Sequence, residues 1–238
     1  MNPVAEQRHT IKGRMLTRHA ISRNKRLSLE YVIAGESGPI IVEVPEQESL
    51  CFIRSSDADL VCQNRELVNI RCKPLALKNF HHEEVSALYS SDMRQQRNLI
   101  RIAKDQGVEL FESDIKAEHR FLIERFIALD VEFSGDFVVG SAAEPARFIA
   151  NKARRTQLTQ PLRAISLDFE CSFSGELYSV ALYGQSQAGL IYEKVIMVGE
   201  PQQTAVDYIQ WVENEVELIL QLITWFNDYD PDIIIGWS

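Results

Sequence analysis

Two carboxylates one residue apart, Asp168 and Glu170, have the types and spacing in this chain that best suit catalysis. They follow the apolar run 164–167, which predicts a β-strand, and ligand sites in α/β proteins gather where strands end. Because side chains alternate along a strand, both carboxylates should project from the same face. Carboxylate oxygens are the ligands that Mg²⁺ and Mn²⁺ prefer. The pair therefore predicts part of a metal site, with Mg²⁺ or Mn²⁺ as the cofactor.

Two divalent ions can hydrolyse a phosphodiester, because together they activate a water molecule and stabilise the leaving oxygen. In such a site we expect Asp168 to bridge both ions, and Glu170 to hold one ion and orient the water. The mechanism needs more carboxylates than these two. Asp228, Asp230 and Asp232 flank a predicted helix-to-strand turn, and turn formation explains them better than metal binding. The acid-x-acid pattern also recurs elsewhere in the chain, so a structural pair at a strand end is the alternative.

Two groups of basic residues are candidates for phosphate contacts. The first is Lys12, Arg14, Arg18, Arg23, Lys25 and Arg26, within fifteen residues that include no Asp or Glu. The second is Lys152, Arg154, Arg155 and Arg163. Phosphate contacts from such residues give nucleic-acid binding that depends on salt and not on base sequence. An ordinary solvated surface explains the same pattern, so both interpretations stay open.

Three aromatic residues, Phe80, Tyr89 and Phe111, could stack on bases. Their strand-like spacing favours positions in the hydrophobic core instead. The neighbouring His81 and His82 have no matching cysteines or carboxylates around them, and we expect them on the surface.

Charge and composition limit the classes of protein to which this chain can belong. Residues 164–238 hold 12 acidic residues and a single basic one, Lys194, whereas the rest of the chain is nearly balanced, which favours two domains. The four cysteines form no Cys-x-x-Cys pair, so reduced thiols are expected rather than a zinc site. The first ten residues lack an apolar signal core and no 18-residue apolar run occurs, which predicts a cytoplasmic protein.

We expect residues 1–157 to form an α+β domain that begins with a β-rich segment. Apolar residues alternate over 27–33, a turn follows at 35–38, and a second strand over 39–44 completes a hairpin. Further strands are predicted over 49–53 and 67–72.

Residues 84–129 show a strand–helix–strand–helix order, which suits a ferredoxin-like unit. Asp92 should cap a helix that runs to Gln106. Asp114 should cap a second helix that carries Leu122, Phe126 and Leu129. Strand-type residues return over 131–133 and 137–139, and residues 141–161 have the composition of a connector.

The remaining residues, 158–238, suit the first part of a ribonuclease-H-like α/β domain that is truncated. Strands are predicted over 164–169, 177–183 and 190–198, followed by a helix over 213–226. We expect Val216, Ile219, Leu220, Ile223 and Phe226 to be the buried face of this helix. The apolar run 233–235 predicts a parallel strand that is buried on both faces.

Several of these segments resemble family B DNA polymerases. Leu167–Glu170, Gly175–Tyr178 and Tyr229–Trp237 resemble the start of the proofreading exonuclease domain, and Asp168-x-Glu170 matches its first motif. Pro74–Phe80 and the region from Asp114 to Phe126 are similar to the N-terminal domain of the bacterial polymerase II type. The resemblance covers the chain from about Leu16 to its end.

This resemblance implies a parent protein that extends DNA on a template from deoxynucleoside triphosphates and removes mispaired 3′ nucleotides. It implies that Asp168 and Glu170 are catalytic metal ligands, and that the N-terminal domain lies near single-stranded template. The second exonuclease motif departs from the family, because Ser238 stands where Asn is usual and the metal-binding Asp would fall beyond the chain. We therefore expect this fragment to be inactive by itself. A sliding clamp is a further partner of such polymerases, but no residue here encodes that contact.

Two other functions stay open. The chain could be a stand-alone ribonuclease-H-like nuclease, although the first motif of such enzymes usually lies near the start of the chain. It could also be a non-catalytic module that binds single-stranded nucleic acid, with Asp168 and Glu170 merely structural.

Overall fold

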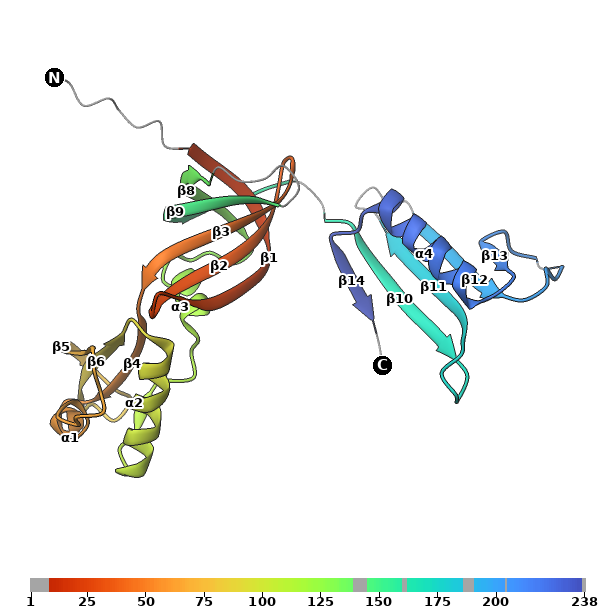
Figure 1. Cartoon of the computed structure of the whole chain (residues 1–238). Coiled ribbons are helices and arrows are strands. Elements are labelled where there is room, and N and C mark those ends of the chain that lie inside the picture. Colours follow the sequence, from red (N-terminus) through yellow and green to blue (C-terminus); the bar gives the residue numbers. More distant parts are fainter. Residues whose placement is uncertain (1–8, 139–144, 160–161, 186–190, 204, 237–238) are drawn as a thin grey trace, which may run out of the picture. The chain divides into compact units, whose positions relative to one another are not determined.

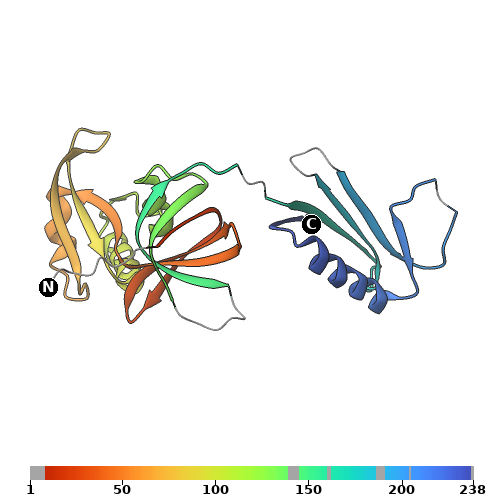
Figure 2. The same cartoon turned by 90° about the horizontal axis from the view of Figure 1, so that it is seen from above.

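A five-stranded closed barrel is formed by strands from the two ends of the first compact unit. The computed structural model describes residues 9–138, 145–159, 162–185, 191–203 and 205–236. The chain divides into two compact units, Met1–Leu158 and Thr159–Ser238. In the first unit the barrel strands are β1 (His9–Arg23), β2 (Arg26–Gly35), β3 (Gly38–Gln47), β9 (Ala146–Arg155) and β8 (Asp130–Phe137), neighbours in that order (Figures 1 and 2). All pairs are antiparallel except β3 with β9.

The β2–β3 hairpin confirms the alternation seen in the sequence. Leu27, Leu29, Tyr31 and Ile33 are all buried inside the barrel. The turn between the strands is narrow, and Gly38 adopts a φ of 121°, which residues with a side chain rarely adopt. Burial of these four apolar side chains stabilises the barrel by roughly 1.5–3 kcal/mol for each.

Strand β9 corrects the predicted connector over 141–161. Residues 146–155 of that segment close the barrel, with Phe148 and Ala150 buried in its core. The prediction was wrong because β9 pairs in parallel with β3, far away in sequence, and its outward positions are charged. Residues 141–144 and 160–161 of the segment lie outside the described residues.

A four-stranded antiparallel sheet with two helices forms the second part of the same unit. It contains β4 (Ser49–Arg54), α1 (Ala58–Cys62), β5 (Ile70–Lys78), β6 (Glu84–Ser90), α2 (Met93–Asp105) and β7 (Leu110–Phe111); the short 3-10 turn η1 (Ser55–Asp57) precedes α1. The strand order is β5-β6-β4-β7, with all pairs antiparallel. This βαββαβ order begins at Ser49, so the range predicted for the unit, 84–129, was wrong.

The two predicted helices of this region had different outcomes. Asp92 caps α2 as expected, because its carboxylate accepts a hydrogen bond from the backbone N–H of Arg94. The second helix, α3 (Ala117–Ile123), is shorter than predicted, and Lys116 rather than Asp114 precedes it. It contributes Phe121 and Leu122 to the barrel core, whereas Phe126 and Leu129 are exposed.

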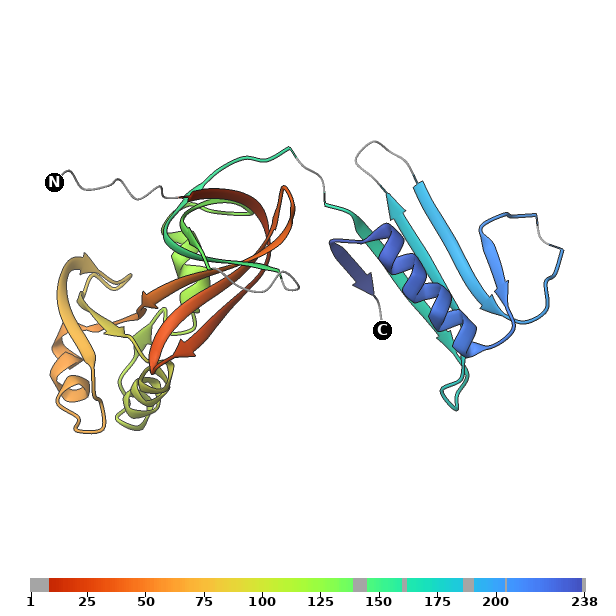
Figure 3. The same ribbon diagram turned by 45° about the horizontal axis from the view of Figure 1, so that its top comes forward.

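The second unit is a five-stranded sheet with one helix on one face. Its strands are β10 (Ala164–Cys171), β11 (Leu177–Gln185), β12 (Ile191–Val198), β13 (Ile209–Val212) and β14 (Ile233–Gly236). Their order is β13-β12-β11-β10-β14, with β11 antiparallel to both neighbours and β14 parallel to β10. Helix α4 (Glu215–Tyr229) lies over one face (Figure 3).

The buried side of α4 differs from the predicted one. Leu218, Leu222 and Trp225, spaced by four and three residues, face the sheet. Four of the five residues predicted to face inward are exposed, and only Phe226 packs against this core; the exposed four are Val216, Ile219, Leu220 and Ile223. The prediction that β14 is buried on both faces was also wrong, because each of its three isoleucines is at least 37% exposed. In the described part of the chain, no helix is long and apolar enough to span a membrane.

Candidate active-site carboxylates and nucleic-acid interface

Asp168 and Glu170 lie on β10, on the face of the sheet opposite to α4. The residues that alternate with them, Ile165 and Leu167, belong to the core beneath α4. Both carboxylates are exposed, and their partners across β11 are Ala181 and Ser179. The two side chains therefore share one open face of the sheet. The predicted position at the strand end is wrong for Asp168, because β10 continues to Cys171 and only Glu170 lies near its C-terminal end.

The chemistry of this pair fits two ligands of a divalent cation. Carboxylates are hard, anionic oxygen donors, and their exposure lets an ion reach them. Among the described residues, no group of three or more His, Cys, Asp or Glu side chains is placed to hold a metal ion. The pairing of β14 with β10 ends at Leu167 opposite Gly236, and residues 237–238 lie outside the described residues.

The acidic residues after α4 are engaged in a turn. Asp232 accepts a hydrogen bond from the backbone N–H of Arg163 at 2.8 Å, and the Arg163 guanidinium donates to Asp230 at 2.8 Å. Asp230 also ends α4 with a φ of 49°. These contacts favour the turn-forming role that the sequence indicated for Asp230 and Asp232, and they occupy Arg163 of the second basic group.

Arg14 holds the barrel together from one of its strands. Its Nε donates to Asp130 Oδ1 at 2.8 Å, and its Nη2 donates to Asp130 Oδ2 at 3.3 Å and to the Leu158 carbonyl at 3.1 Å. Asp130 also accepts a hydrogen bond from the Leu158 N–H at 2.9 Å. The hydrogen bond from Arg14 holds the pKa of Asp130 below its usual range. Arg14 thus joins β1 to β8 and to the segment that follows β9.

Other predicted basic residues also have acidic partners. Arg23 contacts Glu43 at 2.8 Å, and Arg26 contacts Glu46 at 2.8 Å. Arg154 Nε donates to Glu132 at 2.6 Å, and Lys12 Nζ lies 3.8 Å from the same carboxylate. The hydrogen bond from Arg154 lowers the pKa of Glu132, whose side chain is only 7% exposed.

Four of the predicted basic residues are exposed and have no ion pair within the described residues: Arg18, Lys25, Lys152 and Arg155. Lys152 on β9 pairs with Ser134 on β8, and Ser134 pairs on its other side with Thr10 on β1. All three line a cavity of about 510 Å³ on the barrel, together with Arg125, Glu132, Asn151, Ala153 and Arg154. Positive and hydrogen-bonding groups therefore line this cavity, and its one carboxylate, Glu132, is already neutralised by Arg154.

The three aromatic candidates lie in different surroundings. Tyr89 is half-buried, and the guanidinium of Arg71 stacks over its ring at 3.9 Å. Phe111 is half-buried in β7. Phe80 has an exposed fraction of 103%, so the expectation that it belongs to the core was wrong. It lies at the tip of the β5–β6 hairpin, where strand-like spacing no longer indicates burial.

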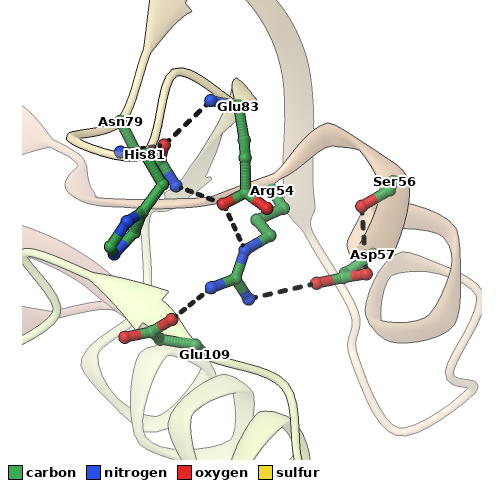
Figure 4. Close-up of polar contacts among 7 residues, drawn as sticks. All are labelled: Arg54, Ser56, Asp57, Asn79, His81, Glu83 and Glu109. Atoms are coloured by element: carbon green, nitrogen blue, oxygen red, sulfur yellow. Dashed lines mark hydrogen bonds and ion pairs between the residues drawn. The ribbon is translucent and has the colours of Figure 1, made fainter.

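A polar network behind this hairpin was not predicted from the sequence. Arg54, at the end of β4, donates to Glu83 at 2.7 Å and to Glu109 at 2.5 Å, and Asp57 lies 3.7 Å away (Figure 4). Asn79 donates to the same Glu83 oxygen at 2.7 Å. These hydrogen bonds lower the pKa of Glu83, with the bond from Asn79 contributing most.

Comparison with known proteins gives one sequence relative and a structural match. The chain is 33% identical to DNA polymerase II of Escherichia coli over 233 residues, which are 95% of this chain and 28% of that protein. No protein-family model matches the chain. The family B DNA polymerase of the archaeon Pyrobaculum calidifontis matches the structure with a TM-score of 0.63, over 94% of this chain and 30% of that one.

These two matches carry different information. The archaeal match is only 13% identical, so it supports the fold alone. The bacterial match extends over nearly the whole chain at an identity that indicates common ancestry, while the chain spans little more than a quarter of that relative's length. The chain is thus a homologue of Escherichia coli DNA polymerase II, and its fold matches part of a family B DNA polymerase.

Proposed function

We propose that this chain forms the N-terminal region of a DNA-directed DNA polymerase that also removes mispaired 3′ nucleotides. The observation that carries the proposal is the homology over 95% of the chain to DNA polymerase II. We assign residues 1–157 to the polymerase N-terminal domain and residues 158–238 to the first part of a 3′–5′ exonuclease domain. The order β12-β11-β10-β14, with its antiparallel β11, supports a ribonuclease-H-like fold for the second part.

Asp168 and Glu170 are the proposed metal ligands of the exonuclease. A pair of Mg²⁺ or Mn²⁺ ions, when bound, would activate water and stabilise the leaving oxygen of the phosphodiester. The protein's contribution is to hold both carboxylates on one open face of β10, away from the core beneath α4. Two ligands do not complete such a site, so we expect the 238-residue chain by itself to be inactive.

The test of these roles uses the full-length polymerase. Asp168→Ala should remove several kcal/mol of transition-state stabilisation and so lower the 3′–5′ exonuclease activity about 10³-fold. The polymerase activity should be unchanged. Asp207→Asn, which changes an exposed carboxylate of the same unit, is the matched control and should leave both activities unchanged. Equal loss of exonuclease activity in both variants, or none in Asp168→Ala, would refute the assignment.

The isolated chain distinguishes the main proposal from its rivals. Robust Mg²⁺-dependent degradation of single-stranded DNA by the 238-residue chain, abolished by Asp168→Ala, would establish a stand-alone nuclease instead. A full-length protein without exonuclease activity that still binds single-stranded DNA would favour the non-catalytic binding module.

We further propose that the exposed surface of β9 around Lys152 and Arg155 contacts the phosphates of single-stranded template. Lys152 and Arg155 are the exposed cations of β9 that have no acidic partner among the described residues. On single strands, each phosphate contact contributes about 0.7 to the slope of log K against log salt. Lys152→Ala combined with Arg155→Ala should therefore reduce that slope by about 1.4 in titrations of oligo-dT at several salt concentrations. An unchanged slope would exclude this surface.

A further inference from the structure

The tip of the β5–β6 hairpin presents a phenylalanine with no packing role. Phe80 is 103% exposed and Leu77, three residues earlier, is 57% exposed. A buried phenylalanine normally contributes roughly 1.5–3 kcal/mol to folding, and Phe80 contributes nothing of this kind. The ring is therefore free to contact another molecule.

The turn that carries Phe80 is held rigidly. The backbone N–H of Asn79 donates to the Glu83 carbonyl at 3.0 Å, and the His82 N–H donates to the Asn79 carbonyl at 3.0 Å. The Asn79 side chain accepts from the N–H groups of His81 and Glu83, each at 3.0 Å. A turn fixed in this way lowers the entropy that a binding partner must overcome when it immobilises the aromatic ring.

The same turn is fastened to the centre of the sheet. Glu83 accepts hydrogen bonds from both Asn79 and Arg54 on one oxygen, and Arg54 belongs to β4, an inner strand of the sheet (Figure 4). Arg54 in turn donates to Glu109, which precedes β7. The charge of Glu83 is therefore neutralised, and Phe80 projects from a support that spans three strands.

The chain before Phe80 is positively charged, whereas two glutamates follow the turn. Residues 70–82 contain Arg71, Lys73 and Lys78, two histidines and no Asp or Glu; Glu83 and Glu84 come next, and Glu84 pairs with Lys78 across the β5–β6 ladder. Lys73 and Lys78 are exposed on β5, which is an edge strand of its sheet, and neither has an ion pair within the described part of the chain. At roughly 3.3 Å per residue, the five residue steps from Lys73 to Lys78 span about 16 Å.

We infer that Phe80 is a stacking platform for a base of single-stranded DNA, with Lys73 and Lys78 contacting the backbone phosphates. Aromatic side chains beside cations bind single strands in this way, because every base has a π-face and every nucleotide a phosphate. A protein partner would explain the exposed ring equally well, but the exposed Lys73 and Lys78, and the neutralisation of Glu83 by Arg54, favour a polyanion. This inference rests on the proposed function, because it takes DNA as the ligand. It adds a second DNA-contact surface, on the β5–β6 hairpin and outside the barrel.

The test uses fluorescence anisotropy with a labelled oligo-dT and the full 238-residue chain. Phe80→Ala should weaken binding at least about 5-fold, the lower end of what one stacked base contributes. Phe80→Trp should retain the affinity, and its added indole fluorescence should be quenched when DNA binds. Phe173→Ala is the matched control, since Phe173 is 111% exposed in the second unit, and it should leave the affinity unchanged.

The lysines provide an independent readout. Lys73→Ala and Lys78→Ala should each reduce the salt slope by about 0.7, whereas Phe80→Ala should leave the slope unchanged. Since Phe80 has no packing partner to lose, loss of the fold is not expected, and far-UV circular dichroism should be unaltered.

Three results would overturn the inference. If wild type does not bind oligo-dT at low salt, both this inference and the proposed template contact of the barrel fail. If wild type binds and only Lys152→Ala weakens binding, the proposal for the barrel stands and the Phe80 platform falls. If Phe80→Ala changes the oligomeric state in sedimentation experiments and not the affinity for DNA, Phe80 is a protein contact.

Discussion

The pair formed by Arg14 and Asp130 is expected to stabilise the barrel rather than bind DNA. Replacing Asp130 by Asn removes the negative charge and leaves the Arg14 guanidinium without its counter-ion. The two side chains are 16% and 13% exposed, so the pair lies between a surface ion pair and a buried one. Breaking a buried pair costs about 3–5 kcal/mol and an exposed pair contributes about 0–1 kcal/mol. We therefore expect Asp130→Asn to lower the free energy of unfolding of the first unit by about 2 kcal/mol.

The distribution of tryptophan allows this effect to be measured for one unit. All three tryptophans, at positions 211, 225 and 237, belong to the unit Thr159–Ser238. Far-UV circular dichroism reports both units, whereas tryptophan fluorescence reports the second alone. A loss of about 2 kcal/mol should lower the melting temperature of the first unit by about 4–8 °C. The fluorescence transition should stay where it is in wild type.

The matched control is Glu46→Gln, which breaks the exposed ion pair with Arg26. Its side chains are 63% and 71% exposed, so the melting temperature should change by less than about 2 °C. If Asp130→Asn has as small an effect as Glu46→Gln, or if both transitions move together, the structural role assigned to Arg14 is wrong.

Acid should reduce the contribution of this pair. The hydrogen bond from Arg14 lowers the pKa of Asp130 in the folded state, whereas an unfolded chain has an ordinary Asp pKa of about 3.9. The stabilisation is therefore complete above about pH 4 and is lost as the pH falls through the lower folded-state pKa. The difference in stability between wild type and Asp130→Asn should be constant near neutral pH and shrink in acid. A difference that grows as the pH falls would contradict this account.

Three further predictions concern the fold and the thiols. Gly135→Ala should destabilise the barrel by roughly 1–3 kcal/mol or more in urea unfolding, because the new Cβ would overlap the Ile149 carbonyl oxygen across β9; unchanged stability would show that the strands can separate there. Burial raises the pKa of Cys51 to about 12, so a thiol reagent at pH 8 should modify the exposed Cys171 first, and Cys171→Ser should remove the fast phase of the reaction. Asp92→Ala should cost about 1 kcal/mol through loss of the α2 cap, measured by urea unfolding of the first unit; no change would mean that packing alone fixes the start of the helix.

Local patterns in the sequence were sufficient for several elements. The alternation over 27–33 gives the β2 strand, and Asp92 marks the start of α2 because its carboxylate satisfies a free backbone N–H there. The period of two along β10 places Asp168 and Glu170 on one face without reference to the rest of the chain. Each of these features depends on residues close together in sequence.

Other features depend on contacts between residues far apart in sequence. Helix α4 is apolar on nearly every side, so its periodicity could not show which face would meet the sheet, and only packing selects Leu218, Leu222 and Trp225. Strand β9 became recognisable through its parallel pairing with β3, more than 100 residues earlier.

The roles of individual side chains divide in the same way. From the sequence, Arg14 is one basic residue among six and Phe80 is one aromatic residue at strand spacing. The tertiary structure places Asp130, 116 residues away, against Arg14, and it turns the chain at Asn79 so that Phe80 projects into solvent. Residue types and local periods thus determined the candidate chemistry and many of the elements, whereas partnership and exposure were decided by the tertiary structure, because both depend on which distant segments meet.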